Sequence, residues 1–444
     1  MEFPVYPKSW KKGMNKLAVV YPNLYYGGVY CLGPLVIYNI VNQMENWFCE
    51  RHFLDKNNLK DANLVGFSFQ YELDYYNFVE MLNQNSIPLE KDSRKEIIFA
   101  GGPCITTNPL TLSKYLDFML IGECEETLPK VLEIYEKGKD KESFLKEISK
   151  MQGIFVPKYS TSPTIATIKD LDSVPYPFYQ PLPKEIDSTF VFGNSFILET
   201  ERGCTFNCKF CPLNRFYYAP RFRTLKSIKE IIDKGLALTR RKKVVIYAPS
   251  FVHPDRKEIL RYLIAKGVEV GVPSIKAEFI DRELMELMKQ AGVKSVTIAP
   301  EAGERLRKLA GKVVPDKRFF DVIGWANELK FDSIKLYFMI GLPGQTTADL
   351  DEMIKFIEDA KKIFHGTVYA SVNTLVPKMR TEYNGIQFEK AKAKQQAYYL
   401  KRKMNTKLKV ANVSTSFKEW KLSNATSFEV KNKLKAIPMH SMDV

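Results

Sequence analysis

The fold is decided by residues 202–211, RGCTFNCKFC, whose cysteines Cys204, Cys208 and Cys211 are spaced C-x3-C-x2-C. Three thiolates this close in one loop converge on one point, and soft sulfur ligands select an iron–sulfur cluster, zinc or Cu(I). A structural zinc site normally has four protein ligands, whereas no cysteine follows Cys211 and the next histidine is His253. The spacing therefore favours a [4Fe–4S] cluster held by three thiolates, with one iron open to a further ligand.

The segment before the cysteines predicts where they lie in the fold. Residues 196–200, FILET, have the pattern of a buried strand. The cysteines then follow in the loop at its C-terminal end, which is where α/β sheets place active sites. A structural metal knuckle, or three unrelated core thiols, is the alternative interpretation.

At these residues the chain resembles the radical S-adenosylmethionine (radical SAM) enzymes, whose cysteine triad has this spacing and an aromatic residue before the last cysteine. Phe210 holds that position here. The resemblance implies that the open iron binds S-adenosylmethionine, with Phe210 beside it, and that electron transfer cleaves this cofactor to a carbon radical.

The composition is that of a soluble globular protein. The chain has 444 residues, of which 45% are hydrophobic and 26% are charged. This length predicts two or three domains, at about 100 to 200 residues each. We expect a cytoplasmic protein without a membrane span, because there is no long apolar run and the first 13 residues lack a signal-peptide core. Seven cysteines, three of them in one loop, do not indicate a disulfide framework.

The net charge is +15, from 66 basic and 51 acidic side chains. A basic chain raises the possibility of a nucleic-acid partner, because Lys and Arg neutralise phosphates. The charge is spread along the sequence, however, and residues 240–243, RRKK, are its densest run. A solvated helix end or an acidic protein partner accounts for the charge equally well.

The first part of the chain, residues 15 to about 150, alternates short apolar runs with helical patterns. This alternation predicts a parallel sheet with crossover helices. The strands are predicted at Leu17–Tyr21, Leu64–Phe69, Ile97–Ala100 and Phe118–Ile121. The helices are predicted at Leu35–Met44, Tyr75–Leu82 and Glu125–Tyr135.

Two of these strands end in glycine turns, 101–104 (GGPC) and 122–125 (GECE), and a long loop, 22–33, follows the first strand. Glycine allows a ligand to approach the backbone closely at the C-terminal edge of a sheet. Ordinary strand-to-helix turns are the alternative for each loop, but several in one sheet favour a bound cofactor. No G-x-G-x-x-G is present, which argues against a nicotinamide.

The same segment resembles the cobalamin-binding domain that accompanies many radical SAM enzymes, because its last strands carry Gly-Gly-Pro and Gly-Glu-x-Glu turns. By this resemblance the residues that line the cobalamin are Tyr25, Gly33, Ser68, Gly101, Gly102, Pro103, Gly122, Glu123 and Glu125. The Asp-x-His-x-x-Gly motif of many cobalamin proteins is absent, and His52 is the only histidine of this domain. The lower cobalt face is therefore expected to have no ligand, or to meet water or a tyrosine.

The remaining chain predicts a linker and a second α/β domain. Residues 153–193 contain six prolines with little periodicity, which is typical of a linker across a domain boundary. Strands then follow at Phe196–Glu201, Val244–Tyr247, Val268–Val272, Ser295–Ala299, Ile334–Ile340 and Val368–Leu375. Six strand–helix repeats are fewer than the eight of a closed barrel. They predict an open, partial (β/α)6 barrel, which is also the radical SAM fold.

Three residues at the strand ends are candidate contacts of S-adenosylmethionine. Glu301 follows the fourth strand, Arg305 lies one turn into the next helix, and Gly341 ends the fifth strand. A carboxylate suits a ribose or an ammonium, and an arginine suits a carboxylate. Helix capping or a plain turn is the alternative for each residue. The Gly-Gly-Glu of many radical SAM enzymes is replaced by residues 247–250, YAPS.

The last part of the chain is expected to contact the substrate. Pro377 and Lys378 follow the sixth strand and begin the loop that we assign to substrate. A basic amphipathic helix is predicted at 386–407, either packed on the barrel or docking a macromolecule. The expected domains are 1–152 (Rossmann-like, cobalamin-binding), 153–193 (linker), 194–380 (radical SAM barrel) and 381–444 (a small α+β or helical cap).

The two resemblances together imply a cobalamin-dependent radical SAM methyltransferase that methylates an unactivated carbon. The expected cofactors are a [4Fe–4S] cluster, S-adenosylmethionine and cobalamin, and the expected partners are a ferredoxin- or flavodoxin-like reductant and a protein or peptide substrate. A glutamine of methyl-coenzyme M reductase is a candidate substrate. One alternative is a methylthiotransferase acting on tRNA or protein, in which Cys31, Cys49, Cys104 and Cys124 would supply a second cluster. A non-catalytic cobalamin-binding protein is the other.

Overall fold

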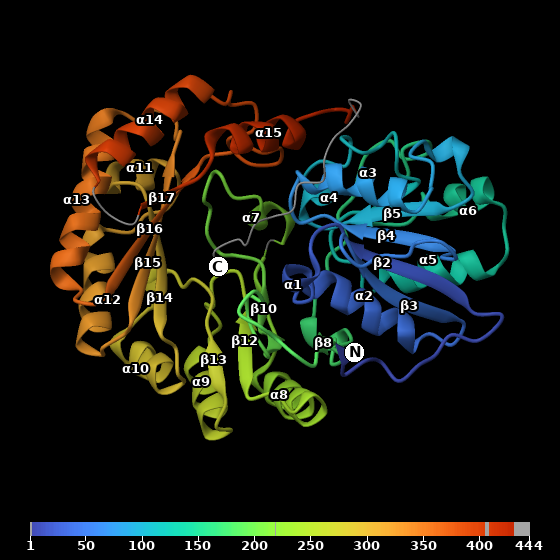
Figure 1. Ribbon diagram of the computed structural model, residues 1–444, viewed down its shortest axis with the longest axis horizontal. Coiled ribbons are helices and arrows are strands. Elements are labelled where there is room, and N and C mark those ends of the chain that lie inside the picture. Colours follow the sequence, from blue (N-terminus) through green and yellow to red (C-terminus); the bar gives the residue numbers. More distant parts are fainter. Residues whose placement is uncertain (1, 218, 405–407, 430–444) are drawn as a thin grey trace. The chain divides into compact units, whose positions relative to one another are not determined.

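The computed structural model describes residues 2–217, 219–404 and 408–429 (Figure 1). They divide into two compact units. Unit 1 contains the described residues up to Phe196, together with Asp233–Arg240 and the described residues from Leu422 onward. Unit 2 contains the described residues of Ile197–Ile232 and Arg241–Lys421. The division passes through two helices, α8 (Leu225–Thr239) and α15 (Val413–Ser423).

Unit 1 is built on a six-stranded sheet, which confirms the predicted α/β class. In spatial order its strands are β3 (Trp47–Phe53), β2 (Asn15–Tyr21), β4 (Leu64–Ser68), β5 (Ile97–Gly101), β6 (Phe118–Leu120) and β7 (Ile154–Phe155). The first five are parallel, and β7 is antiparallel to β6. The four predicted strands are present, whereas β3 was not predicted because Glu50, Arg51 and His52 interrupt its apolar pattern.

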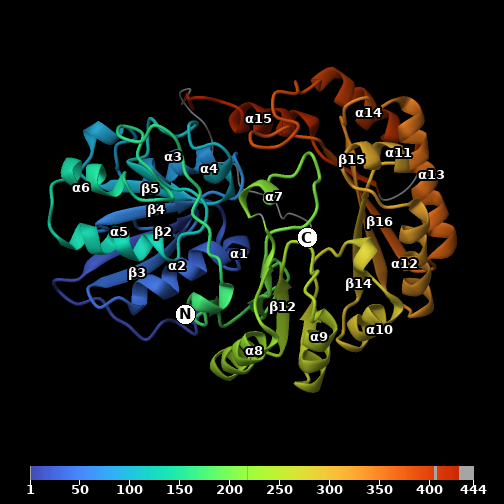
Figure 2. The same ribbon diagram turned by 180° about the vertical axis from the view of Figure 1, so that it is seen from behind.

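Helices cover both faces of this sheet, as Figures 1 and 2 show. On one face, α3 (Asp74–Gln84) and α4 (Pro103–Thr107) share a core with Val20, Val65 and Phe67. On the other face, α2 (Leu32–Gln43), α5 (Thr127–Glu136) and α6 (Lys141–Ile148) share a core with Leu17, Val19 and Trp47. Alternate residues of β2 therefore face opposite cores, as the two-residue period of a strand requires. The predicted helices correspond to α2, α3 and α5.

The predicted linker, 153–193, lies within unit 1 and is tied to it at several points. Its first residues form β7, Ala166 forms a parallel bridge with Gly122, and β8 (Leu182–Pro183) pairs with β1 (Glu2–Phe3). The tyrosine Tyr30 also donates a hydrogen bond to the carbonyl of Gly193 at 2.5 Å. Hydrogen-bond ladders do not need apolar periodicity, which is why the proline-rich composition concealed this docking.

Besides the two-stranded sheet of β10 (Glu201–Arg202) and β11 (Arg221–Phe222), unit 2 contains a three-stranded and a four-stranded sheet. The first has the order β13 (Glu269–Gly271), β12 (Lys243–Tyr247) and β9 (Phe196–Glu199), and the second has β14 (Ser295–Glu301), β15 (Ser333–Ile340), β16 (Thr367–Thr374) and β17 (Leu408–Val410). All pairs of the second sheet are parallel. The six predicted strands are present, but they do not form one continuous ladder. The segment between β13 and β14 contains Pro273, which has no N–H to donate to a strand ladder.

Helices connect the strands of unit 2 in the expected alternation. They are α9 (Arg256–Ala265), α10 (Arg282–Gln290), α11 (Glu304–Leu309), α12 (Asp316–Glu328) and α13 (Thr347–Ile363). None of the helices in the described part of the chain is both long and apolar enough to cross a bilayer.

The described part of the region predicted as a cap is divided between the units, and residues 430–444 of that prediction lie outside the described residues. The predicted basic helix is α14 (Lys390–Lys403), and the end of that prediction, 405–407, lies outside the described residues. One side of α14 is buried through Ala393, Gln396, Ala397 and Leu400. The strand β17 extends the second sheet beside β16, and the residues from Leu422 onward belong to unit 1.

Candidate functional site

The cysteine loop follows β9 and the two-residue strand β10 (Glu201–Arg202), which pairs with β11 (Arg221–Phe222). Cys204 and Cys208 are buried, and Cys211 is partly buried. Burial raises the pKa of the Cys211 thiol to about 11. Burial also raises the pKa of Cys208, whereas the nearby cations Lys276 and Lys312 act to lower it.

The three thiols are close enough to influence one another electrostatically, because Cys208 and Cys204 both contribute to raising the pKa of Cys211. Among the residues that the structure describes, no three His, Cys, Asp or Glu side chains form a finished metal site. Metal binding supplies much of the free energy that assembles such sites. The donor set still fits an iron–sulfur cluster, because three thiols of one loop are present with basic side chains beside them.

Phe210 joins the cysteine loop to the ends of the strands in the second sheet. Its ring packs against a buried cluster formed by Ala302, Leu306, Ala310, Leu342, Leu375 and Tyr383. Two backbone hydrogen bonds hold the neighbouring residue Lys209. Its N–H donates to Ala310 O at 3.0 Å, and its carbonyl accepts from Tyr383 N at 3.3 Å. The aromatic position of the motif therefore connects the cysteines with the loops after β14, β15 and β16.

The loop is also closely packed at Gly311. A Cβ atom at that glycine would lie 2.3 Å from the carbonyl oxygen of Asn207 and would overlap it. Together with the contacts of Phe210 and Lys209, this close approach determines where the cysteine loop lies relative to the second sheet.

Glu301, a predicted cofactor contact, is the last residue of β14 and has the unusual φ of +66°. Its carboxylate forms an ion pair with Lys312 at 3.2 Å, and the lysine also donates to the carbonyl of Ala299. Both side chains are largely buried. Lys312 was not predicted as a site residue because it lies 11 positions away, beyond a helix.

Arg305, the second predicted contact, has a partner within the protein. Its guanidinium lies 2.5 Å from Asp349, which is almost fully buried and belongs to the capping box of α13 with Thr346. The structure therefore gives Arg305 the role of joining α11 to the start of α13, which the sequence could not indicate because the two residues are far apart in the chain.

Gly341 follows β15 with a φ of +80°, and its N–H donates a hydrogen bond to Gln396 Oε1 at 2.9 Å. Lys378, in the predicted substrate loop after Pro377, forms an ion pair with Glu419 of α15 at 2.9 Å. Both contacts involve the C-terminal helices of unit 2. The predicted cap is thus bonded to the strand-end loops of its own unit.

In unit 1, backbone atoms of the protein occupy the space beside two of the glycines that were predicted to contact the cofactor. A Cβ at Gly102 would lie 2.6 Å from Phe69 O, and one at Gly122 would lie 2.2 Å from Ala166 O. Both glycines have positive φ values, of +99° and +92°. Close packing within unit 1 therefore explains these glycines without a ligand.

Of the other residues predicted to contact cobalamin, some are engaged within the protein and others have space beside them. Pro103 begins α4, Glu125 is buried, and the buried Glu123 accepts a hydrogen bond at 2.5 Å from the N–H of Ile168. Tyr25, in the short helix α1 (Tyr25–Gly28), donates to Glu2 at 2.6 Å. By contrast, a Cβ at Gly33 would meet only Ser68 Oγ, at 3.6 Å, and one at Gly101 would make ordinary contacts with Leu120. Backbone packing of the kind seen at Gly102 and Gly122 is therefore absent at Gly33 and Gly101, and Ser68 is buried beside Gly33.

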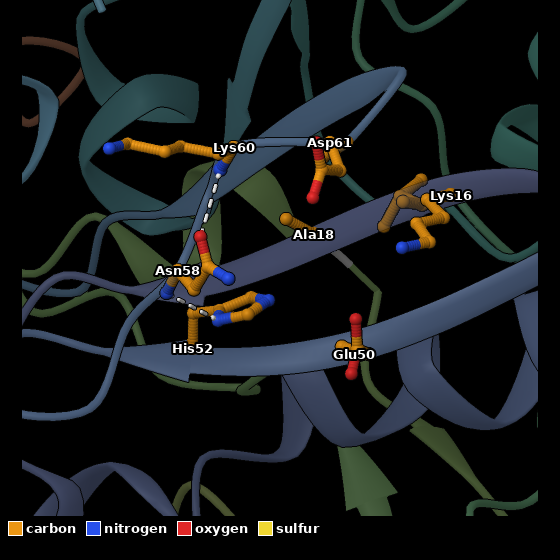
Figure 3. Close-up of a pocket in the computed structure, with 9 residues that line it drawn as sticks. Lys16, Ala18, Glu50, His52, Asn58, Lys60 and Asp61 are labelled. Carbon is orange, nitrogen blue, oxygen red and sulfur yellow. Dashed lines mark hydrogen bonds between the residues drawn. The ribbon is translucent and has the colours of Figure 1, made fainter. Parts of the chain in front are cut away.

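His52 lies away from these glycines, on β3. It lines a small cleft of about 30 Å³ and accepts a hydrogen bond from the N–H of Asn58 at 3.3 Å (Figure 3). The cleft is lined by Lys16, Leu17, Ala18, Glu50, His52, Asn58, Lys60, Asp61 and Ala62. It has room for about one water molecule. Burial lowers the pKa of His52 to about 4, so the imidazole is neutral near pH 7.

Three of the four cysteines outside the triad lie on different sides of the unit 1 sheet, and the fourth, Cys31, is the N-cap residue of α2. Cys49 is in the core that contains α2, α5 and α6, and Cys124 packs against that core. Cys104 is in the core on the opposite face. The sheet separates Cys104 from the other two, so these three thiols do not form one metal site.

Comparisons with known proteins identify both halves of the chain. A family model described as "Radical SAM proteins, N-terminal" matches residues 55–157, and the model of the radical SAM superfamily matches residues 198–357. The chain is 31% identical over 395 residues to the uncharacterized protein MJ0966 of Methanocaldococcus jannaschii, covering 87% of this chain and 83% of that protein. It is 26% identical over 384 residues to the putative methylthiotransferase MJ0865 of the same organism, covering 78% and 77%.

Among solved structures, the radical S-adenosylmethionine methyltransferase TsrM from Kitasatospora setae, with cobalamin and a [4Fe–4S] cluster bound, has a similar fold. Its TM-score is 0.61 at 13% identity, and the match covers 83% of this chain and 74% of that chain. At this identity the likeness concerns the fold alone.

Proposed function

The chain belongs to the radical SAM superfamily of enzymes, and we propose that it is a cobalamin-dependent methyltransferase acting on an unactivated carbon. The observation that carries the proposal is the buried C-x3-C-x2-C loop, which Phe210 joins to the strand-end loops of the second sheet. The cluster and S-adenosylmethionine would supply a carbon radical, and cobalamin would supply the methyl group.

In this proposal, Cys204, Cys208 and Cys211 hold the cluster, and the chain's other residues orient the cofactor and exclude water. Phe210 fixes the loop, while Glu301 and Gly341 offer a carboxylate and a glycine turn at the ends of β14 and β15. The ion pair with Lys312 holds the Glu301 carboxylate in place, which suits the binding of hydroxyl groups such as those of ribose. Arg305 stays a predicted contact, and its bond to Asp349 involves one nitrogen of a guanidinium whose side chain is about half exposed.

We place cobalamin at the C-terminal edge of the unit 1 sheet, on Gly33, Ser68 and Gly101. Two features support this placement: the space beside Gly33, where an added Cβ would come no closer than 3.6 Å to another atom, and the fold shared with TsrM, whose structure contains cobalamin. His52 is turned toward Asn58 in its own cleft, so the proposed cobalamin receives no imidazole from it. The lower cobalt face is then left to water or to no ligand.

A protein side chain is the proposed substrate class, with a glutamine of methyl-coenzyme M reductase as the specific candidate. The basic charge, the exposed lysines of α14 and its single arginine, Arg402, support an acidic macromolecular surface as the docking partner. The reaction needs a low-potential one-electron donor such as a ferredoxin or flavodoxin, and an oxygen-sensitive cluster suits the reducing cytoplasm.

A methylthiotransferase is the second candidate, because the relative MJ0865 is described as a putative methylthiotransferase. Such an enzyme would need a second cluster from cysteines outside the triad. The position of Cys104 on the opposite face of the sheet from Cys49 and Cys124 removes it from such a set, which would then require Cys31, Cys49 and Cys124 together. The third candidate, a non-catalytic cobalamin-binding protein, would account for the fold of unit 1 but not for the buried C-x3-C-x2-C loop of unit 2.

The proposal is tested by anaerobic purification, cluster reconstitution, iron counting and extraction of bound corrin. We expect about four irons per chain, corrin absorption bands and reductive cleavage of S-adenosylmethionine. The triple variant with Cys204, Cys208 and Cys211 changed to Ala should lose iron and cleavage, whereas Cys124→Ala serves as the matched control and should keep both. About eight irons would favour the methylthiotransferase. Absence of any corrin would overturn the cobalamin assignment.

A further inference from the structure

Lys276 presents a buried cation without a hydrogen-bond partner. It lies between β13 and β14, and its Nζ atom is buried with no hydrogen-bond acceptor among the described residues. An ammonium group that is removed from water is strongly destabilised unless a negative charge or several hydrogen bonds replace the lost hydration. The Lys276 ammonium group therefore needs a nearby negative charge, because no hydrogen bond within the described residues replaces its lost hydration.

The cysteine loop holds this lysine in place. Its Nζ lies 3.0 Å from the centre of the Phe206 ring, and Phe206 is the residue midway between Cys204 and Cys208. Phe206 is itself supported by an edge-on contact with Phe279, with ring centres 5.6 Å apart. A cation over an aromatic face is a favourable but weak contact, which positions an ammonium group without neutralising it.

The titratable groups near Lys276 are the thiols of Cys208 and Cys204, together with Lys312 and Glu278. Lys312 is already paired with Glu301 at 3.2 Å. Among these neighbours, the two cysteines have the largest electrostatic influence on Lys276. The site that would provide a compensating negative charge is thus the cysteine loop itself.

We propose that Lys276 is the counter-charge of the iron–sulfur cluster and favours its reduced state, an inference that rests on the proposed function. Three thiolates give a [4Fe–4S]²⁺ core a net negative charge, and uptake of one electron from an external one-electron donor adds a second. A fixed cation stabilises the more negative state more than the less negative one. Lys276 therefore acts through its fixed positive charge, which makes the cluster easier to reduce.

The test compares Lys276→Met and Lys276→Gln with the charge-conserving Lys276→Arg, all after reconstitution and iron counting. The ratio of reduced to oxidised cluster is measured by electron paramagnetic resonance at fixed potentials set with dithionite and mediators, without S-adenosylmethionine. We expect this ratio to fall about tenfold in the two neutral variants and to stay close to the wild-type value in Lys276→Arg.

Lys234→Met is the matched control, because Lys234 also lies over a phenylalanine ring, 4.3 Å from the centre of Phe178, but in unit 1. It removes the same charge and should leave the ratio unchanged. An unchanged ratio in iron-loaded Lys276→Met or Lys276→Gln would overturn the inference. If these variants also bind S-adenosylmethionine more weakly, the carboxylate of that cofactor, and not the cluster, is the anionic partner of Lys276.

Two further outcomes concern cluster assembly. Loss of iron from both neutral variants, with retention in Lys276→Arg, supports the counter-charge, because the positive charge would then be required to hold the anionic cluster. Loss of iron from all three variants would contradict it. Failure of the wild-type protein to take up iron would instead overturn the proposed function, so the two failures are distinguishable.

Discussion

The N–H of Gly341 donates a hydrogen bond to the side-chain oxygen of Gln396, at 2.9 Å. Gly341 directly follows β15, and Gln396 is a buried residue of α14, the basic helix near the C-terminus. The bond satisfies a backbone donor at a turn where the strand can no longer supply an acceptor. It makes α14 part of the support for the proposed cofactor site as well as a candidate docking surface.

Replacing Gln396 with Ala should destabilise unit 2 and disturb the Gly341 turn. The N–H of Gly341 would lose its partner, and an unsatisfied buried donor costs about 1–3 kcal/mol. We expect a lower free energy of unfolding in urea and weaker binding of S-adenosylmethionine to the reconstituted protein. Gln395→Ala is the control, because Gln395 is exposed on the same helix. Equal effects of the two changes would contradict the role of Gln396.

Gly122→Ala should destabilise unit 1, because the new Cβ would lie 2.2 Å from Ala166 O and the φ of +92° disfavours alanine. The loss is expected to be about 3 kcal/mol, from the overlap and the backbone strain together. Gly138→Ala separates the two causes, because Gly138 has a φ of +66° and a Cβ added there would have no atom within 4 Å. That change should cost only about 1 kcal/mol. Unfolding free energies of the two variants provide the measurement.

The C-terminal residues of the described chain are bound to unit 1, and Phe428 is their main contact. Its ring is buried against Tyr75, Tyr76 and Tyr115, and the hydroxyl of Tyr115 donates to its carbonyl at 2.8 Å. Phe428→Ala should release this segment, because truncating a buried phenylalanine costs about 3–5 kcal/mol. Limited proteolysis should then cleave the C-terminal segment faster.

Ser427→Ala is the control for this prediction, because Ser427 is exposed and precedes Phe428 directly. Its cleavage rate should match that of the wild-type protein. Cleavage of Phe428→Ala at the wild-type rate would show that the remaining contacts, such as the hydrogen bond from Ser423 to Glu72 at 2.8 Å, are sufficient by themselves.

His52 should make unit 1 sensitive to acid. Its pKa is lowered by burial from 6.5 to about 4 in the folded protein. Between these values the unfolded chain binds a proton that the folded chain does not, so stability is lost as the pH falls from 6.5 toward 4. The loss is at most about 3 kcal/mol. His52→Gln should flatten this part of the stability profile in urea unfolding at several pH values, and identical profiles would refute the prediction.

Local patterns were sufficient for most of the strands and helices, and the exceptions have physical causes. The edge strand β3 carries three consecutive polar residues, because an edge strand is only partly buried. The segment 153–193 docks through backbone bonds, such as the bridge of Ala166 with Gly122, that leave no trace in apolar periodicity. Its position could therefore not be predicted from composition.

The sequence by itself determined the cysteine spacing, the aromatic position at Phe210 and the alternation of strands and helices, because each is a short-range pattern. Only the tertiary structure decided which charged residues have partners inside the protein. Arg305 is held by Asp349, Glu301 by Lys312, and Lys276 is left as a buried cation over Phe206. These relationships join residues from separate elements, and charge pairing depends on distance in space rather than on position in the chain.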